Sequence, residues 1–387
     1  MATGIMPCDN DGDETMGTVT VIHGDQIDQM IEQITSVSDI LNTVHSQDTV
    51  LIKPNLVVSR REWAGVNTDP GVVEAIVKVL KARGISRITV GDGAGMGYNA
   101  SKAMQICGYR DLAQRYGLKL VDLEKDGFVS QPVSIEGPFK SLEIAQTVIN
   151  CDFLINVPVM KAHGQTLITC SLKNLKGVMP RAMKTGFHGV DLDQAIAQLA
   201  SVVTPDLIIV DGIQGDLFSE TGHNPVRMER ILSGTNPVEV DSVAADMLGY
   251  SPRTIRHIAL SADAGLGLCD LDRIKVNALN QPTNDQPIPP PVHFWEKFQC
   301  RIEADGACCT CMGNLLFALQ RLNEKGLLSE DQLFLTGQKV NLPLDSSETT
   351  IAVGRCAVKS GAADIRIDKC PPSAGTIYRS AMSSGKA

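Results

Sequence analysis

The stretch VLIKPNLVVSRREWAGVNTDPGVVEAIVKVLKARGISRITV, residues 50–90, decides the fold. It opens with an apolar run from Val50 to Ile52 and closes with another from Ile88 to Val90. Between them lies a helix-like segment, residues 71–82. Its apolar side chains recur at the helical period of about 3.6 residues: Val72, Ala75, Ile76 and Val79. The stretch is therefore predicted to fold as a strand, a helix and a second strand.

The same alternation extends over residues 18–280. Further strand-like apolar runs are Leu118 to Val121, Phe153 to Val157 and Leu207 to Val210. Another helix is predicted from Asp191 to Val203. Apolar strands that alternate with helices are typical of a sheet buried on both faces. The predicted fold class is α/β, a largely parallel sheet flanked by helices, plus a smaller α/β domain.

The domain organisation follows from a proline-rich segment, because five of the eleven residues from 281 to 291 are proline. Such a segment favours an extended spacer, so residues 281–292 are predicted to be a linker. It divides an α/β substrate-binding domain, residues 18–280, from a cluster domain, residues 293–387. The alternative is a long surface loop inside one domain. Residues 1–17 are polar and acidic and are predicted to form a disordered tail.

Composition narrows the function classes. The net charge of −9 argues against a nucleic-acid partner and against binding to anionic membranes. The apolar stretches are too short for a membrane helix, and the N-terminus lacks the pattern of a secretory signal. Eleven cysteines without such a signal favour a reducing compartment, where clustered cysteines are commonly metal ligands. We expect a cytoplasmic protein, and a homodimer is compatible with the sequence.

The cysteines of the last ninety or so residues form a constellation. Cys308 and Cys311 make one Cys-x-x-Cys, and Cys356 and Cys370 each stand alone in a loop that follows a predicted strand. Tetrathiolate zinc usually takes two Cys-x-x-Cys knuckles, and irregular spacing suits an iron–sulfur cubane. Zinc, a redox dithiol and buried structural cysteines stay open as alternatives at this point.

A resemblance favours the cubane. A Cys-x-x-Cys after a glycine, then Gly-x-Cys, then Cys-Pro-Pro, is similar to the proximal-cluster domain of nickel–iron hydrogenase small subunits. The similarity covers roughly residues 304–374. It implies a [4Fe–4S] cluster held by Cys308, Cys311, Cys356 and Cys370. Lys369 departs from the glycine usual in that family, and the adjacent Cys309 makes the first ligand ambiguous.

A basic segment lies in the middle of the chain, where no Asp or Glu occurs between Asp152 and Asp191. It follows a predicted strand, and ligand sites of α/β sheets lie at the carboxyl ends of strands. Cations without carboxylate partners attract anions, so we predict an anion site. Its candidate residues are Lys161, His163, Lys173, Asn174, Lys176 and His188. The alternatives are a solvated basic face, an interface with an acidic partner, or a metal site on the two histidines.

The N-terminal domain resembles the domain of unknown function 362 family. The matching segments are Leu51-Ile-Lys-Pro-Asn55, Thr68-Asp-Pro70, Ile155-Asn-Val-Pro-Val-Met-Lys-Ala-His163, Ser171-Leu-Lys-Asn-Leu-Lys-Gly177 and Pro237-Val-Glu-Val-Asp241. The resemblance spans most of residues 18–280. It implies an architecture that often accompanies iron–sulfur modules, and it names no reaction.

Other polar residues follow predicted strands. Gly95, Gly97 and Ala100 fit a dinucleotide fingerprint, with Asp122 about twenty residues on, but a tight turn explains them equally well. The segment Lys53-Pro-Asn55 and single residues behind other strands are further candidates: Asp211, Asp216 and His223. The two aspartates fit pocket acids or, alternatively, helix caps and turn residues.

These observations predict an iron–sulfur redox enzyme of anaerobic metabolism. It would act as a reductase or electron-transfer enzyme on a small anionic substrate, and a ferredoxin-like protein would donate electrons. One alternative is a hydro-lyase with an open cluster iron, although four cysteine ligands argue against it. Another is a non-enzymatic electron-carrier subunit.

Overall fold

The computed structural model describes residues 16–61, 63–187, 190–217, 220–222, 225–282, 298–305, 307, 309–341, 347–359, 361 and 363–384. For residues 309, 310 and 384 it describes the backbone alone. Most of the predicted tail, residues 1–17, and most of the predicted linker, residues 281–292, lie outside these ranges. The division at the linker therefore stays a prediction.

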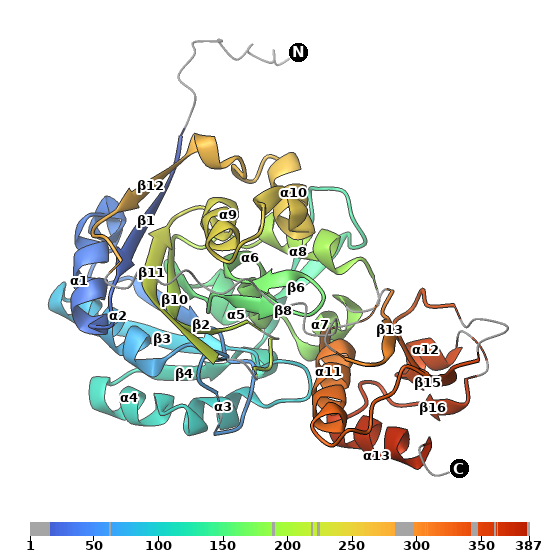
Figure 1. The fold of residues 1–387 in the computed structure, drawn as a ribbon. Helices are drawn as coiled ribbons and strands as arrows, with labels where there is room; N and C mark the ends of the chain where they lie inside the picture. Colours follow the sequence, from blue (N-terminus) through green and yellow to red (C-terminus); the bar gives the residue numbers. More distant parts are fainter. Residues whose placement is uncertain are drawn as a thin grey trace, which may run out of the picture.

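An eight-stranded sheet forms the centre of the larger part of the molecule, in the order β12-β1-β11-β10-β7-β2-β3-β4 (Figure 1). In chain order its strands are β1 (Gly17–His23), β2 (Thr49–Pro54), β3 (Arg87–Asp92), β4 (Lys119–Asp122), β7 (Phe153–Val157), β10 (Leu207–Asp216), β11 (Pro225–Gly234) and β12 (Ile274–Ala278). Strands β10, β7, β2, β3 and β4 pair in parallel. Only β11 runs antiparallel to its neighbours β1 and β10 among these described pairs. The predicted α/β class with a largely parallel sheet is confirmed.

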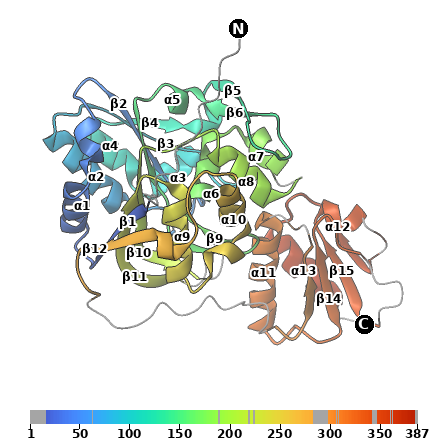
Figure 2. The ribbon, with the colours of Figure 1, turned by 90° about the horizontal axis from the view of Figure 1, so that it is seen from above.

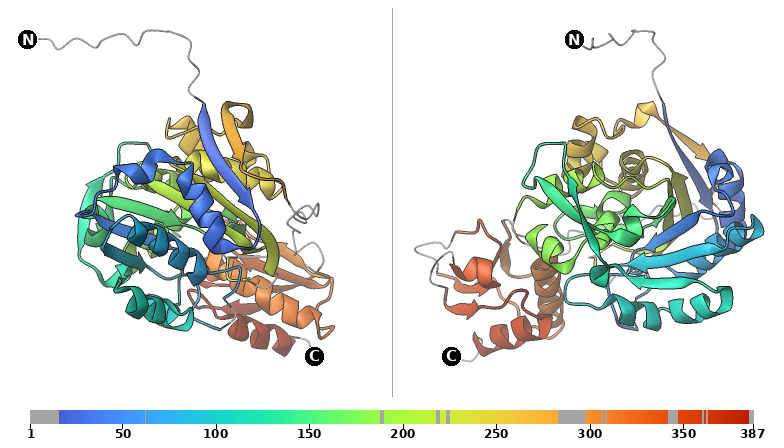
Figure 3. Two further views of the ribbon diagram at one scale, coloured as in Figure 1. Left: turned by 90° about the vertical axis from the view of Figure 1, so that its left-hand side faces the viewer. Right: turned by 180° about the vertical axis from the view of Figure 1, so that it is seen from behind.

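Neighbouring residues of each strand point to opposite faces of the sheet. Both faces of this sheet are apolar, and helices cover both. Val50 and Ile52 of β2 pack into one apolar core, and Leu51 packs into the other. Figure 3 shows α1 (Ile27–Ser36) and α2 (Pro70–Ala82) together on one face. The opposite face is covered by α8 (Leu192–Ala200), α9 (Pro237–Met247) and α10 (Arg256–Asp263).

Capping positions α2 firmly behind β2. The Asp69 side chain accepts a hydrogen bond from the backbone N–H of Gly71 at 2.8 Å, and Pro70 begins the helix. Both favour the start of a helix. The Asp69 side chain satisfies one N–H group that the first turn leaves unpaired, and Pro70 has no N–H that needs a partner. The backbone N–H of Asp69 in turn donates to the Asp211 carboxylate at 2.8 Å. The helix start is thereby fixed to the end of β10.

A smaller domain follows, built on a four-stranded parallel sheet in the order β13-β14-β15-β16. Its strands are β13 (Arg301–Glu303), β14 (Gln332–Thr336), β15 (Thr349–Val353) and β16 (Ile365–Ile367), and its helices are α11 (Cys309–Asn323), α12 (Arg355–Lys359) and α13 (Ala374–Ser384). The apolar stripe of α11 fills its core with Leu315, Leu316, Leu319 and Leu322. In Figures 1 and 2, α11 is the element of this domain that faces the larger sheet.

The helices within the described ranges fall short of what a membrane span needs in length and apolar character. The predicted helix at residues 191–203 appears as α8, shifted by a few residues at its ends. Such shifts at helix ends are usual.

Candidate functional site

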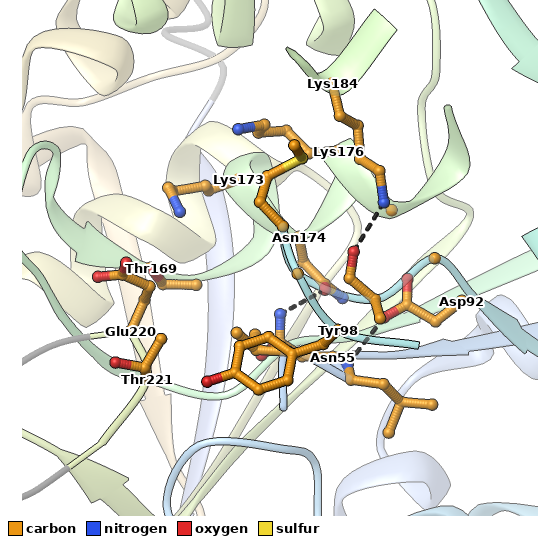
Figure 4. A pocket seen from close by; sticks show the side chains of 17 residues that line it. Asn55, Asp92, Tyr98, Thr169, Lys173, Asn174, Lys176, Lys184, Glu220 and Thr221 are labelled. Carbon is orange, nitrogen blue, oxygen red and sulfur yellow. Dashed lines mark hydrogen bonds between the residues drawn. The ribbon is translucent and has the colours of Figure 1, made fainter. Parts of the chain in front are cut away.

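A cavity of about 90 Å³ lies at the carboxyl edge of the large sheet. Its walls come from segments 55–57, 92–98, 169–177 and 220–221, together with Lys184. The first two segments follow β2 and β3, so the cavity occupies the place where ligands of α/β sheets bind. Figure 4 shows Thr169, Glu220 and Thr221 at one end, Asp92 and Lys184 at the other, and Lys173 and Lys176 above.

The basic segment reaches this cavity through a hairpin and a short helix. The hairpin pairs β8 (Lys161–His163) with β9 (Leu167–Thr169), and α6 (Ser171–Asn174) follows. The first backbone N–H groups of α6 donate to the buried carboxylate of Asp241, from Ser171 at 2.6 Å and from Leu172 at 3.0 Å. This anchor places Lys173, Asn174 and Lys176 in the cavity wall.

A buried ion pair lies beneath the cavity. Lys53 Nζ is 2.6 Å from Asp92 Oδ1, and the two side chains are 0% and 3% exposed. The other Asp92 oxygen accepts from the backbone N–H of Leu56 at 2.7 Å. A Cβ on Gly177 would lie 2.7 Å from Lys53 Nζ, so only glycine fits against the pair. Burial lowers the pKa of Lys53 and raises the pKa of Asp92, which means that desolvation outweighs their mutual attraction.

Three asparagines extend this polar floor. Asn174 Oδ1 accepts from Lys53 Nζ at 3.2 Å and from Asn55 Nδ2 at 2.8 Å. Asn174 Nδ2 donates to Asn156 Oδ1 at 2.7 Å. The amide of Asn174 is therefore held by neighbours from β2, β7 and the loop after β2. Asn174 lies in the cavity wall, and its contacts position the lysines around it; the anion site itself stays a prediction.

Lys161 is buried outside the cavity wall. Its side chain is fully buried, and Nζ donates to Asn55 Oδ1 at 2.9 Å, to the Glu220 carbonyl at 3.3 Å and to the Val66 carbonyl. Desolvation, followed by repulsion from Lys173, lowers the pKa of Lys161 to about 7. Lys161 therefore ties the loop after β2 to the segment that carries Glu220.

The pKa of Lys161 predicts a pH dependence of stability. In an unfolded chain the amine keeps its proton until its ordinary pKa of 10.5, whereas in the folded protein it loses the proton near pH 7. The folded state thus binds fewer protons between these values, so the free energy of unfolding should rise with pH. Lys161→Met should remove this rise, as measured by urea unfolding at pH 7, 8 and 9.

The matched control for that measurement is Lys275→Met, because Lys275 is exposed on the edge strand β12. It should keep the wild-type slope of stability against pH. Equal slopes in Lys161→Met and wild type would show that Lys161 does not titrate in this range.

His163 is held as a neutral imidazole. Its Nδ1 accepts hydrogen bonds from the backbone N–H groups of Gln165 and Thr166, both at 3.0 Å. The ring proton must then be on Nε2, which lies 3.7 Å from Glu220 Oε2. Desolvation first, and then the charge of Lys173, lowers the pKa of His163 well below its ordinary value. A protonated Nε2 donates hydrogen bonds and offers no lone pair to a metal. His188, the other predicted histidine, lies outside the described residues.

The basic segment has carboxylate partners in space, contrary to the expectation from its sequence. Lys184 Nζ lies 2.5 Å from Glu124 Oε1, and Arg181 Nη2 lies 2.7 Å from Glu124 Oε2. Glu124 belongs to the turn η2 (Leu123–Lys125) after β4. The absence of acidic residues from the segment between Asp152 and Asp191 does not predict these ion pairs, because Glu124 comes from another part of the chain. The cavity lysines outside these two ion pairs with Glu124 and Asp92 are Lys173 and Lys176.

The glycine-rich loop after β3 is shaped by packing. A Cβ on Gly95 would lie 2.8 Å from the Val57 carbonyl, and one on Gly93 would lie 2.8 Å from the Gly177 carbonyl. These glycines therefore let three loops meet around the cavity. Asp122 accepts from the backbone N–H of Glu124 at 3.2 Å and so caps η2. This local role accounts for Asp122 without a dinucleotide.

The two aspartates predicted to follow a strand, Asp211 and Asp216, both lie within β10. Asp211 is 2% exposed and accepts from the backbone N–H groups of Asp69 and Ile213, at 2.8 and 3.1 Å. Burial raises the pKa of Asp211 to about 7. Its contacts match the cap and turn role. Asp216 is fully buried and is not part of the cavity wall. His223 lies outside the described residues.

The loops that carry the predicted cluster cysteines meet in the smaller domain. A Cβ on Gly354 would lie 3.2 Å from Cys311 Sγ and 3.9 Å from the Lys369 carbonyl. The backbone N–H of Arg355 donates to that same carbonyl at 3.1 Å. The chain segments that carry Cys311 in α11, Cys356 in α12 and Cys370 after β16 are therefore neighbours, and the latter two cysteines are exposed.

Cys308 lies outside the described residues, and only the backbone of Cys309 is described. Within the described part of the chain, no three His, Cys, Asp or Glu side chains are grouped closely enough to hold a metal ion. The four-cysteine cluster therefore stays a prediction.

The start of α11 packs against the cavity wall. A Cβ on Gly313 would lie 3.2 Å from Glu220 Oε1 and 3.7 Å from Thr221 Oγ1, and one on Gly164 would lie 3.5 Å from Met312 Cγ. Cys311 lies one residue before Met312 and two residues before Gly313 in the chain. Sequence reasoning missed Glu220 and Thr169 as site residues. No local pattern marks Glu220, and its position becomes informative only when α11 and β10 are placed together.

Fold and site define an α/β protein with a buried lysine, asparagine and carboxylate cluster at the carboxyl edge of its sheet. The chain belongs to the family described as Domain of unknown function (DUF362), whose model matches residues 50–246. It is 29% identical over 232 residues to the thylakoid-associated protein sll1697 of Synechocystis sp., covering 58% of this chain and 70% of that protein.

A solved structure, the lactate racemase apoprotein from Thermoanaerobacterium thermosaccharolyticum, matches with a TM-score of 0.39 and 12% identity. The match covers 62% of this chain and 59% of the racemase, so this chain spans less than two thirds of that protein.

Proposed function

We propose that this protein is an iron–sulfur redox enzyme that acts on a small anionic substrate in the cavity. One [4Fe–4S] cluster would be held by Cys308, Cys311, Cys356 and Cys370. The observation that carries the proposal is the position of α11, whose first turn contains Cys311 and packs against Glu220 and Thr221 in the cavity wall. A cysteine site and a substrate site that share one helix end would support a common reaction.

The donor set fits an iron–sulfur cluster. Thiolates are the usual ligands of such clusters, and three cysteine-bearing loops are neighbours around Gly354. The missing Cβ at Gly354 leaves space beside Cys311 Sγ, where a larger residue would press on the sulfur. The start of α11 also favours thiolate over thiol, because the helix dipole is positive there. When bound, the cluster would supply single electrons, received from a ferredoxin-like donor.

The cavity's own residues favour a small anion. Lys173, in α6, is 9% exposed, and Lys176, in the turn that follows α6, is half-buried. In this cavity the charges of Lys173 and Lys176 would attract a carboxylate or phosphate and stabilise negative charge that develops on it.

Removal of Lys176 should weaken anion binding without changing iron content. Loss of one partly desolvated charge contact costs about 2 kcal/mol, which is roughly thirtyfold in affinity. Lys176 belongs to the larger domain, whereas all four proposed ligands lie beyond residue 300, so the cluster should be unaffected. The measurement is calorimetric titration of anaerobically purified wild type and Lys176→Ala with butyrate and with inorganic phosphate, with iron quantified in the same samples.

Lys275→Ala is the matched control, since it removes one exposed lysine from β12, the outermost strand at one side of the sheet. Its affinities should equal those of wild type. Equal affinities in Lys176→Ala would reduce the cavity to a surface feature. Oxidation of a pre-reduced cluster on addition of an unsaturated acid such as crotonate, with the acid reduced to its saturated product in the same step, would support the reductase. A ligand-induced spectral change without net electron transfer would instead support the hydro-lyase with an open iron.

A further inference from the structure

Three buried polar atoms, two in the cavity wall and one next to it, have no hydrogen-bond partner among the described residues. They are His163 Nε2, Thr169 Oγ1 and Glu220 Oε2, on side chains that belong to residues 3%, 2% and 6% exposed. Buried polar groups in folded proteins almost always find a partner, and unpaired ones mark places where a ligand or an ordered water binds. Three such atoms in one region indicate a specific polar guest.

The hydrogen-bonding character of two of these atoms is set by their surroundings. Because Nδ1 of His163 accepts from two backbone N–H groups, Nε2 carries the proton and donates. Glu220 Oε2 is a carboxylate oxygen and accepts when ionised. The two atoms are 3.7 Å apart, too far for a direct hydrogen bond and close enough for both to contact one intervening oxygen.

We infer that this end of the cavity is a subsite for a hydroxyl group, and that the substrate is a small hydroxyl-bearing anion. The inference deepens the proposed function and rests on it. A hydroxyl oxygen accepts from His163 Nε2–H and donates its own hydrogen to Glu220, which satisfies both atoms at once. A carbonyl oxygen has no hydrogen for Glu220, and a carboxylate oxygen is repelled by it. Thr169 offers a further hydroxyl that either donates or accepts.

The anionic group of this substrate lies toward the lysines. Figure 4 shows Lys173 between Lys176 and the pair Thr169 and Glu220. A carboxylate or phosphate beside the lysines therefore lies a few atoms from a hydroxyl at Glu220. A small molecule of this kind can be accommodated in the cavity, whose volume is about 90 Å³.

Paired ligands test the inference. We would titrate anaerobically purified full-length protein with 3-hydroxybutyrate and butyrate, and with glycerol 3-phosphate and propyl phosphate. Within at least one pair, wild type should bind the hydroxyl-bearing member about tenfold more tightly, since a site built for a hydroxyl is left with unpaired groups by the analogue that lacks it. The pair that shows the preference identifies carboxylate or phosphate as the anionic group.

Variants at Thr169 and Glu220 separate the hydroxyl subsite from the anion site. Thr169→Val and Glu220→Gln should bring the ratio of the two affinities to within about threefold, and Thr169→Ser, which keeps the hydroxyl, should retain the wild-type ratio. Equal affinities in wild type, or a preference that survives both Thr169→Val and Glu220→Gln, would overturn the inference while leaving the anion site intact. Failure of all four ligands to bind wild type would overturn the proposed function itself.

Discussion

Cys356→Ala and Cys370→Ala should each strip most of the iron from anaerobically purified protein. The wild type is expected to contain about four irons and four sulfides per chain, the content of one cubane. Each cysteine would supply one of four thiolate bonds, and loss of one leaves an iron open to solvent and to release. Because both residues are exposed, their replacement removes little packing. Iron and sulfide analysis with absorption spectroscopy is the measurement, and Cys311→Ala should behave alike.

Cys300→Ala is the matched control, because Cys300 lies in the same domain and packs against its apolar core. Burial raises the pKa of Cys300 to about 12, so it stays a protonated thiol, whereas cluster ligands are thiolates. This variant should keep its full iron content. Cys308→Ala compared with Cys309→Ala identifies the first ligand of the chain. Stoichiometric zinc in oxygen-free wild-type protein, with no iron, would contradict the cluster.

The parallel part of the fold was predictable from the sequence, because its strands are continuous apolar runs. The predicted run at residues 207–210 is the buried start of β10, and the run at residues 153–157 is β7 itself. Strand β11 gave no such signal, since its first half, Pro225 to Arg230, is mostly accessible and polar. Of these residues only Met228 is buried, whereas Ile231, Leu232 and Ser233 are buried in succession. A strand with few buried apolar residues in its first part therefore lacks the continuous apolar run that marks its neighbours.

The candidate site was predictable in part, for a reason of geometry. Lys173, Asn174 and Lys176 follow a strand closely, so their position at the sheet edge could be inferred from local order. Glu124 and Glu220 reach the same place from distant parts of the chain. A segment without acidic residues in sequence can thus be surrounded by them in space. Lys161 illustrates the same limit, because main-chain carbonyls of Val66 and Glu220 bind its Nζ.

The largest change in stability is expected for Lys53→Met. The variant leaves the Asp92 carboxylate 3% exposed and without the Lys53 cation, while the backbone N–H of Leu56 still donates to it. Loss of one partner of a buried ion pair costs about 3–5 kcal/mol, because the other charge stays desolvated and uncompensated. Asn174 Oδ1 would also lose its bond from Lys53 Nζ. Urea unfolding at pH 7, with the midpoint and slope fitted together, measures the loss.

An exposed ion pair supplies the comparison. Lys78 Nζ lies 2.8 Å from Asp28 Oδ2, with side chains 43% and 64% exposed. Lys78→Met should therefore cost less than about 1 kcal/mol, since solvent screens such pairs. Equal losses in Lys53→Met and Lys78→Met would contradict the buried pair.

The double variant Lys53→Met/Asp92→Leu separates the charge from the packing. It removes both charges and keeps apolar volume in place of the pair, so the desolvated carboxylate that destabilises Lys53→Met is gone. Apolar replacement of a buried ion pair is often close to neutral in stability. Here the backbone N–H of Leu56 also loses its acceptor, which adds about 1–3 kcal/mol. The double variant should therefore be more stable than Lys53→Met alone, and a lower stability would show that Asp92 acts chiefly through its bond to Leu56.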